Sequence, residues 1–450
     1  MRGSLPESLA PEARALYERD LRSVAGIEKL RFFPLAVVEG SGCWLVEAGG
    51  RRLLDLTSTW TAAGLGHGHP AVTEAVVRAS RAPAGAGGLS AVHPDSVGLA
   101  EELLALVPGE GDRRVYLGHA GSDANDVAIR AARFATNKRR VVAFEHSYHG
   151  GLGVAMGVSG VHVDAGSARS DPDSVFVPYP NPYRPPTAPQ GVDPHDAAVQ
   201  QSLDAVARAL DEGDVACVMV EPILSDGGLV VPPTGFLAQL QAICRRHDTL
   251  MVCDEVKVGL GRPGLLHAFE ADGIVPDMVT FGKVLGNGMP LSAAVGPAWV
   301  LDGPPAAALL TTAGNPVCTA VGRAVLRTLV ADDLAARARA AGERLRAGLM
   351  RLELEQVGDV RGRGLAVGVE LVADRGTKEP DHMLAAKTVY RAFELGAVVY
   401  YVGGNVLEVT PPLVISDEEV DHAVDLLGSA IADAAAGKVA DETVAPYAGW

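Results

Sequence analysis

Two short apolar runs, each leading into a charged residue, dominate the stretch from residue 250 to residue 290. The first run, 250–253, is followed by Asp254, and the second, 278–281, is followed by one glycine and then Lys283. Apolar runs of this length, bounded by Gly and Pro, are typical of buried parallel strands. Because ligands of open α/β sheets bind beyond the carboxyl ends of such strands, we expect Asp254 and Lys283 to face one crevice.

A lysine and an acid in these positions suit pyridoxal phosphate. The amine of Lys283 can bond to the cofactor aldehyde, and Asp254 can keep the pyridine nitrogen protonated, so that the ring draws electrons from the reacting carbon. A buried ion pair at two strand ends would place the same residue types there. The pair alone therefore leaves both interpretations open.

The sequence around the pair is more specific. The segments DEVKVGLGRPG (254–264), AFEADGIVPD (268–277) and FGKVLGNGMP (281–290) resemble the class III pyridoxal-phosphate enzymes of fold type I, and the resemblance covers nearly the whole chain. It implies an aspartate-aminotransferase-like α/β fold, with a large domain built on a mostly parallel sheet and a smaller α+β domain. It also implies pyridoxal 5'-phosphate as cofactor, a small-molecule substrate, and a homodimer with active sites at the subunit interface.

Length and composition restrict the class of protein. A chain of 450 residues is too long for one ordinary core, so we expect more than one domain. The net charge of −16 argues against nucleic acid or an anionic membrane as partner. Five scattered cysteines without metal-ligand spacing are typical of reduced thiols, and we see neither a signal peptide nor a membrane-spanning run. We therefore expect a cytoplasmic protein without a metal site.

Three segments form the expected domain organisation. Residues 1–64 should be an N-terminal arm with part of the small domain, and residues 65–325 the large cofactor-binding domain. Residues 326–450 should be a linking helix and the C-terminal small domain.

Several local expectations accompany this division. The apolar and aromatic run 27–34 should pack on the small domain or on a partner subunit, and residues 82–88 should form a flexible connection. Residues 171–196 are rich in Pro and polar side chains, which predicts a surface excursion. One long helix should run from 316 to about 352, and Ser416 should open the last helix with a capping box.

A Gly-Ser turn between a strand and a helix is the candidate phosphate site. Backbone N–H groups at a helix N-terminus bind anions, and the turn resembles the family's S-G-S-(E/D)-A-N pattern. Since Ala120 replaces the first Ser, the contact should rest on Gly121 and Ser122. By the same resemblance, Tyr148 stacks on the pyridine ring and also borders the substrate, while Thr311 binds the phosphate of the other subunit.

The substrate side of the expected site departs from the aminotransferase pattern. Trp60 holds the place of a substrate-site aromatic, although core packing would also explain it. Many relatives carry an arginine that clamps a substrate carboxylate where this chain has Glu408. A carboxylate cannot attract a carboxylate, so the substrate lacks a free α-carboxylate at that end or another arginine binds it.

Two further departures lie near the expected cofactor. Where relatives often place a glutamate that pairs with the missing arginine, this chain has Asp226. Two acids sharing a crevice push one pKa upward, which would leave Asp226 partly protonated and able to donate a proton. Lys257 replaces a glutamine that lies beside the cofactor's phenolic oxygen in relatives, and we expect it to add positive charge there.

Together these departures resemble the α-amino-ε-caprolactam racemase branch of the family, with the segments SDGG (225–228) and NVLEVTPPL (405–413). That branch acts on a cyclic amide of lysine, which has an α-amine but no carboxylate. The resemblance implies racemisation of α-amino lactams or amino acid amides by two bases, Lys283 and Asp226, on opposite faces of the α-carbon. A single swinging lysine, a class III aminotransferase of ω-amines or amino acids, and an amino-acid 2-epimerase remain the alternatives.

Overall fold

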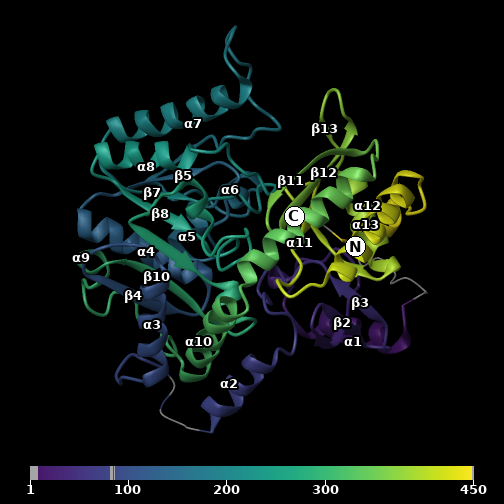
Figure 1. Ribbon diagram of the computed structural model, residues 1–450, viewed down its shortest axis with the longest axis horizontal. Helices are drawn as coiled ribbons and strands as arrows, with labels where there is room; N and C mark the ends of the chain where they lie inside the picture. Colours follow the sequence, from purple (N-terminus) through teal and green to yellow (C-terminus); the bar gives the residue numbers. More distant parts are fainter. Residues whose placement is uncertain (1–8, 82–84, 86, 448–450) are drawn as a thin grey trace. The chain divides into compact units, whose positions relative to one another are not determined.

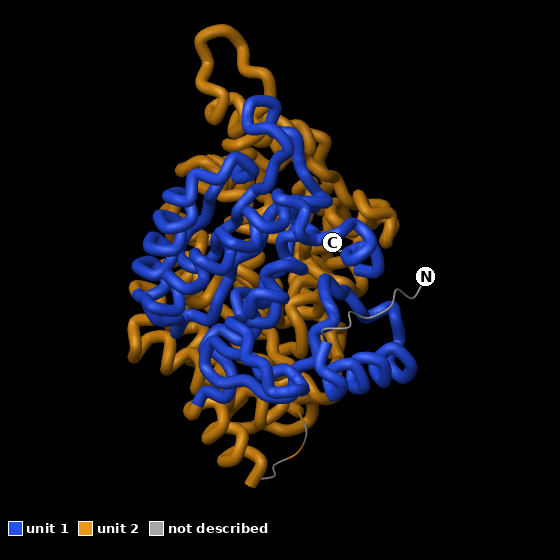
Figure 2. Tube along the Cα trace, turned by 90° about the vertical axis from the view of Figure 1, so that its right-hand side faces the viewer, with its two compact units in different colours: residues 1–69, 337–450 blue, residues 70–336 orange. Residues whose placement is uncertain are grey.

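The computed structural model describes residues 9–81, 85 and 87–447, and it divides into two compact units. One unit consists of residues 1–69 and 337–450, the two ends of the chain, and the other of residues 70–336 (Figure 2). The sequence placed these boundaries after residues 64 and 325. Most of the predicted flexible connection, residues 82–84 and 86, lies outside the described residues.

The unit 70–336 is built on a seven-stranded sheet with the order β4-β10-β9-β8-β7-β5-β6. Strand β10 pairs antiparallel with both its neighbours, and every other pairing in the sheet is parallel. This is the mostly parallel sheet expected from the sequence. The predicted α/β fold class of this unit is therefore confirmed. The strands are β4 (Arg113–Gly118), β5 (Arg140–Phe144), β6 (Ser174–Val177), β7 (Val215–Val220), β8 (Leu250–Asp254), β9 (Met278–Phe281) and β10 (Ser292–Pro297).

Helices cover this sheet (Figure 1). Helix α4 packs across β4, β7, β8, β9 and β10, and its Ala128, Ile129 and Ala132 form part of the buried core. Helices α7 and α8 pack on one another, and α8 also contacts β8. The helices of this unit are α2 (Pro70–Ser80), α3 (Pro94–Leu106), α4 (Gly121–Thr136), α5 (Gly153–Gly157), α6 (Gly160–Asp164), α7 (Pro194–Asp211), α8 (Phe236–Arg246), α9 (Ala298–Leu301) and α10 (Pro316–Ala331), with 3-10 turns η2 (Ala268–Asp272) and η3 (Lys283–Gly286).

Two local predictions in this part of the chain were wrong. The segment 171–196 is not only a surface excursion, because it contains β6, which pairs with β5 at the edge of the sheet. The single long helix is two helices, α10 and α11 (Leu334–Arg351). The break falls at Asp333, whose backbone is left-handed with φ 45°, a conformation that Asp tolerates better than most residues.

The unit formed by the chain ends contains two sheets. The first has the order β1-β2-β3-β14, and β2 and β3 form the hairpin whose turn contains residues 49 and 50. The second has the order β11-β12-β16-β15, with β13 paired to β12. The strands are β1 (Val37–Ser41), β2 (Trp44–Glu47), β3 (Arg52–Asp55), β11 (Val357–Arg363), β12 (Ala366–Asp374), β13 (Glu379–Pro380), β14 (Ala397–Val398), β15 (Tyr400–Val402) and β16 (Val406–Val409).

Helices and an aromatic cluster complete this unit. Its helices are α1 (Pro11–Ser23), most of α11, α12 (His382–Leu395), α13 (Asp417–Ala435) and α14 (Asp441–Val444), with the 3-10 turn η1 (Gly26–Glu28). Phe32 and Phe33 are buried as predicted, and the Phe33 ring stacks on Phe393 with centroids 4.7 Å apart. Ile27, in contrast, is 99% exposed in this chain, so for this residue the predicted contact with a partner subunit stays a prediction. No helix in the described part of the chain is long and apolar enough to cross a membrane.

The predicted capping box at the start of α13 is present and can be tested. The Ser416 hydroxyl accepts the N–H of Glu419 at 3.1 Å, and the Glu419 carboxylate accepts the N–H of Ser416 at 2.9 Å. Replacing Ser416 by Ala should lower the free energy of unfolding by about 1 kcal/mol, measured by urea unfolding. Ser416→Asp, which keeps a capping oxygen, is the matched control, and equal stability of the Ala variant and the parent would contradict the assignment.

Candidate active site

Five segments at the ends of parallel strands supply the predicted site residues of the unit 70–336 other than Thr311. They follow β4, β5, β7, β8 and β9, whose carboxyl ends share one edge of the sheet. Asp254 is the last residue of β8, and Lys283 follows β9 after Gly282. The backbone of Lys283 is left-handed with φ 45°, a strained conformation for a side chain with a Cβ.

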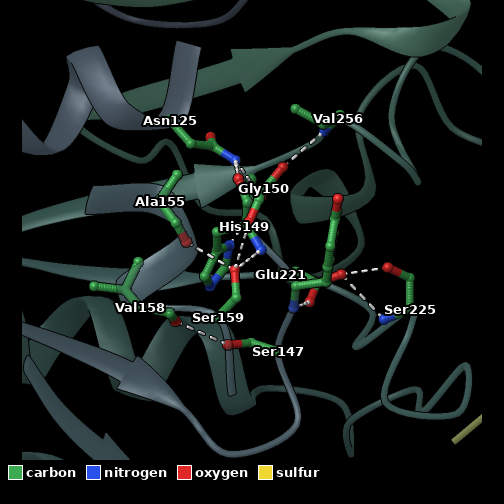
Figure 3. A network of polar contacts seen from close by, with 12 residues as sticks. Asn125, Ser147, His149, Gly150, Ala155, Val158, Ser159, Glu221, Ser225 and Val256 are labelled. Atoms are coloured by element: carbon green, nitrogen blue, oxygen red, sulfur yellow. Dashed lines mark hydrogen bonds and ion pairs between the residues drawn. The ribbon is translucent and has the colours of Figure 1, made fainter. Parts of the chain in front are cut away.

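Three donors hold the buried carboxylate of Asp254. Asn125 donates through Nδ2 to Oδ2 at 2.7 Å, His149 Nδ1 lies 2.8 Å from the same oxygen, and the N–H of Val256 donates to Oδ1 at 3.0 Å. Asn125 also donates to the carbonyl of His149 at 2.7 Å, so these residues form one network (Figure 3). The network fixes the direction in which the acid points, as expected of a group that must meet a ring nitrogen.

The sequence did not predict that Asn125 and His149 would contact the carboxylate of Asp254. Both lie in motifs that were recognised, the helix-opening turn after β4 and the loop that carries Tyr148 after β5. Their contact with Asp254 could have been anticipated only from the spatial order of β4, β5 and β8.

Three segments, those of Gly121, Val256 and Gly282, pack closely at the turn before α4. A Cβ added at Gly121 would lie 2.4 Å from Cγ1 of Val256, and one added at Gly282 would lie 3.1 Å from the backbone nitrogen of Gly121. Ser122 accepts the N–H of Gly151 at 3.1 Å through its hydroxyl. A Cβ at Gly121 would therefore clash with the Val256 side chain, and one at Gly282 would crowd the backbone of Gly121, while the N-terminus of the 16-residue helix α4 favours an anion there.

Asp123 fixes the shape of that turn. Its carboxylate accepts the N–H groups of His119 and Ala120 at 2.8 and 3.1 Å and the hydroxyl of Ser292 at 2.6 Å. The helix start is thereby tied to β10, where Ser292 begins the strand.

Asp226 forms a buried ion pair with Lys257. The Lys257 Nζ lies 2.7 Å from Oδ1 of Asp226, and each residue is 5% exposed. Burial opposes ionisation of Asp226, but the charges of Lys257 and Lys283 outweigh burial and hold its pKa below the ordinary value. The expectation of a raised pKa and a partly protonated Asp226 was therefore wrong, because it ignored Lys257 as a counter-ion.

Tyr148 lies close to this ion pair. The pKa of its hydroxyl is raised to about 12, chiefly by burial and also by the charge of Asp226, while Lys257 opposes the shift. Its ring centroid is 5.4 Å from that of His162, on α6. His162, which the sequence did not single out, thus belongs to the same neighbourhood.

Thr311 lies in an exposed turn between α9 and α10. The neighbouring Thr312 hydroxyl lies 2.9 Å from Nε2 of His119, which precedes the turn of α4. The contact of Thr311 with the phosphate of a second subunit stays a prediction.

The remaining two candidates belong to the unit formed by the chain ends. The Trp60 ring stacks on Tyr400 at 4.8 Å, and Trp60 lies in a run of four left-handed residues, 58–61, with φ between 43° and 66°. No glycine occurs in that run, so its conformation was not predictable from composition. Trp60 is only half-buried, which distinguishes it from an ordinary core residue.

Glu408 is buried in β16, opposite Tyr400 of β15 and Gly368 of β12. Burial, together with the charges of Asp55 and Glu408, raises the pKa of the Tyr400 hydroxyl. An anionic group at position 408 therefore acts on the same aromatic residue on which Trp60 stacks.

The arrangement in the unit 70–336 fits pyridoxal phosphate. It offers a held carboxylate, a lysine at a neighbouring strand end, and a glycine-lined helix N-terminus, which match the ring nitrogen, the aldehyde and the phosphate of the cofactor.

Comparison with known proteins agrees with this arrangement. Residues 27–431 match the family model described as aminotransferase class III. The chain is 34% identical to leucine/methionine racemase of Thermococcus litoralis over 97% of this chain and 99% of that protein. It is 33% identical to isoleucine 2-epimerase of Lentilactobacillus buchneri over 98% and 99%, and 36% identical to acetylornithine aminotransferase of Mycobacterium tuberculosis over 90% and 93%.

Solved structures give the same result for the fold. The ω-transaminase of Pseudomonas jessenii in complex with PMP superimposes with a TM-score of 0.87 at 26% identity, over 94% of this chain and 98% of that one. The fold is that of the fold-type-I enzymes, and the cofactor is pyridoxal phosphate. The chain belongs to the class III aminotransferase family.

Proposed function

We propose that this enzyme racemises α-amino lactams or α-amino acid amides, as α-amino-ε-caprolactam racemase does, by proton transfer at the α-carbon. The observation that carries the proposal is Asp226, a buried carboxylate whose ionisation is favoured by the charges of Lys257 and Lys283. In relatives that keep a substrate-binding arginine, a glutamate often occupies this position and pairs with that arginine. The missing arginine leaves Asp226 available for proton transfer.

The relatives support the racemase part of the proposal. Two of them, matched over nearly their whole length, are named leucine/methionine racemase and isoleucine 2-epimerase. These names describe those proteins, and both refer to inversion at an α-carbon. Neither name refers to a lactam or an amide, so the substrate class rests on Glu408 in place of the arginine.

The chain's own residues have distinct roles in binding the cofactor. Pyridoxal phosphate, when bound, supplies an aldehyde for the substrate amine and a protonated ring that withdraws electrons from the α-carbon. Asp254 would hold the ring nitrogen, and the amine of Lys283 would hold the aldehyde. Gly121 and Ser122 bind the phosphate with Thr311 of a second subunit, and Tyr148 packs on the ring. The enzyme is therefore a homodimer in this proposal.

Two bases then act on opposite faces of the α-carbon. On one face the amine of Lys283 would take up the α-proton, and the bound cofactor would supply the electron-withdrawing ring that makes this proton acidic. On the other face the Asp226 carboxylate is the acceptor for the opposite enantiomer, and the carboxylic acid formed is the donor for the reverse reaction. An ionised Asp226 is suited to the accepting role, and Lys257 keeps it ionised between turnovers.

A class III aminotransferase is the second candidate. It is favoured by the 36% identity to acetylornithine aminotransferase. Such an enzyme returns the proton to the cofactor and needs a keto acid to complete its cycle. An amino-acid 2-epimerase acting on free amino acids would require another cation for the substrate carboxylate.

Deuterium incorporation separates these reactions. With an L-amino lactam or L-amino amide in D₂O and no keto acid, the enzyme should abolish optical rotation while deuterium enters the α-carbon, because proton exchange and inversion share one step. Rotation is followed by polarimetry and deuterium by mass spectrometry. Loss of rotation only after addition of a keto acid, with accumulation of the corresponding ketone, would identify an aminotransferase instead.

Removing the charge of Asp226 tests the second base. Asp226→Asn should slow inversion by at least about a hundredfold, the usual contribution of a positioned acid–base group, measured with each enantiomer separately. Because Lys257 would lose its counter-ion, the matched control is the double variant Asp226→Asn/Lys257→Gln, which removes both charges. Near-normal inversion in either variant would eliminate Asp226 as a base.

The glycine contact at the phosphate turn gives a test of cofactor binding. Gly121→Ala places a methyl group 2.4 Å from Cγ1 of Val256, and such overpacking costs about 1–3 kcal/mol, so the affinity for pyridoxal phosphate should fall about tenfold or more. Titration of the apoenzyme, followed by visible absorbance, measures this affinity. Val256→Ala should partly restore the affinity when combined with Gly121→Ala. Unchanged affinity in Gly121→Ala would remove this turn from the cofactor site.

A further inference from the structure

Glu221, the first residue after β7, binds two separate segments with the two oxygens of one carboxylate. Its Oε1 accepts the N–H of Tyr148 at 2.9 Å, and its Oε2 accepts the N–H of Ser225 at 3.1 Å and also the Ser225 hydroxyl. Figure 3 shows the side chain between these segments. The residue is 3% exposed, and the Tyr179 hydroxyl donates to its carbonyl oxygen at 3.0 Å.

The two segments carry the two groups on which the proposed reaction depends. One is Tyr148, whose ring packs on the cofactor in the proposed function, and the other is the turn that presents Asp226 directly after Ser225. We infer that Glu221 is a positioning residue that sets Tyr148 and Asp226 relative to one another, so that the acid lies over the face of the α-carbon opposite Lys283. This inference rests on the proposed function and deepens it.

The donors around Glu221 differ from those around Asp226 and Asp254, the other two buried acids at this edge of the sheet. In the described part of the chain, Asp226 contacts the cation Lys257, and Asp254 contacts His149, which is cationic when protonated. The side chain of Glu221, in contrast, accepts hydrogen bonds from neutral donors, the two backbone N–H groups and the Ser225 hydroxyl. Of the three, Glu221 is the one whose carboxylate is held by neutral donors.

This difference makes the link that Glu221 forms between Tyr148 and Ser225, here called the clamp, sensitive to pH. The pKa of Glu221 is raised to about 7, chiefly by burial and also by the charges of Asp254 and Asp226, while His149 and the Ser225 hydroxyl oppose the shift. Protonation makes one oxygen a donor, and neither the Tyr148 nor the Ser225 N–H can accept. At least one hydrogen bond of the clamp then weakens, so inversion should fall as the pH drops through about 7.

A purely structural role predicts a different result. Glu221 would then matter only for stability, and a folded variant would keep the same proton-transfer behaviour as the parent. The useful readout is the ratio of inversion to α-proton exchange with retention, because Lys283 alone can exchange the proton of one enantiomer without help from Asp226.

The experiment compares the holoenzyme with Glu221→Gln, in which a neutral amide replaces the carboxylate. With α-amino-ε-caprolactam in D₂O, chiral chromatography with mass spectrometry gives inversion and retained exchange for each enantiomer from pH 5.5 to 8.5. We expect Glu221→Gln to lower the ratio of inversion to retained exchange at least tenfold for one enantiomer. We also expect the inversion rate of Glu221→Gln to lack the change near pH 7 that we expect for the parent.

Glu255 offers a matched control. It is also a buried carboxylate, and it accepts the N–H groups of Ala268 and Phe269 at 2.9 Å each, but the segment it holds, η2, carries none of the predicted site residues. Glu255→Gln should keep both the ratio and the step near pH 7. If Glu221→Gln does not fold, Glu221→Asp, which keeps the charge but shortens its reach, should lower the ratio while retaining a pH step.

The outcomes separate the two claims. Inversion by the parent, together with a ratio and pH profile in a folded Glu221 variant equal to those of the parent, would overturn the positioning role alone. Absence of inversion in the parent would overturn the proposed function, and with it this inference.

Discussion

The common direction of the parallel strands is the constraint on which the site depends. Residues after β4, β5, β7, β8 and β9 meet at one edge of the sheet only because these strands run the same way and lie in the order observed. The strands are stable there because their apolar runs are buried on both faces, as in β7 and β8. The charged residues at their ends are thereby held in a buried region without belonging to the core.

Three buried acids at this edge, Asp254, Asp226 and Glu221, differ in the groups that hold their carboxylates, and their roles differ accordingly. Asp254 is fixed in direction by Asn125 and His149, as its proposed contact with the ring nitrogen requires, and Lys257 favours the ionised form of Asp226. Glu221 accepts hydrogen bonds from neutral donors and links the other parts of the site. The environment of each acid, rather than its residue type, determines what it does.

The sequence predicted what depends on local pattern and on family motifs. The apolar runs before Asp254 and Lys283 identified two strands, the motifs around them identified the cofactor and the fold class by resemblance, and the capping box at Ser416 was readable from four residues. The Asp226–Lys257 ion pair was missed because it joins turns after two neighbouring strands, and periodicity does not give the direction of a side chain beyond a strand end. The break at Asp333 was missed because the Ala- and Arg-rich pattern on both sides outweighed the Asp332-Asp333 pair between them.

The central claim is that Asp226 and Lys283 face opposite sides of the substrate's α-carbon. A crystal structure of the holoenzyme with a bound α-amino lactam tests it most directly. The account predicts the Asp226 carboxylate within about 3–4 Å of the α-carbon, on the face opposite the Lys283 amine, and no guanidinium at the substrate. An Asp226 carboxylate turned away from the α-carbon, or an arginine bound to the substrate, would contradict it.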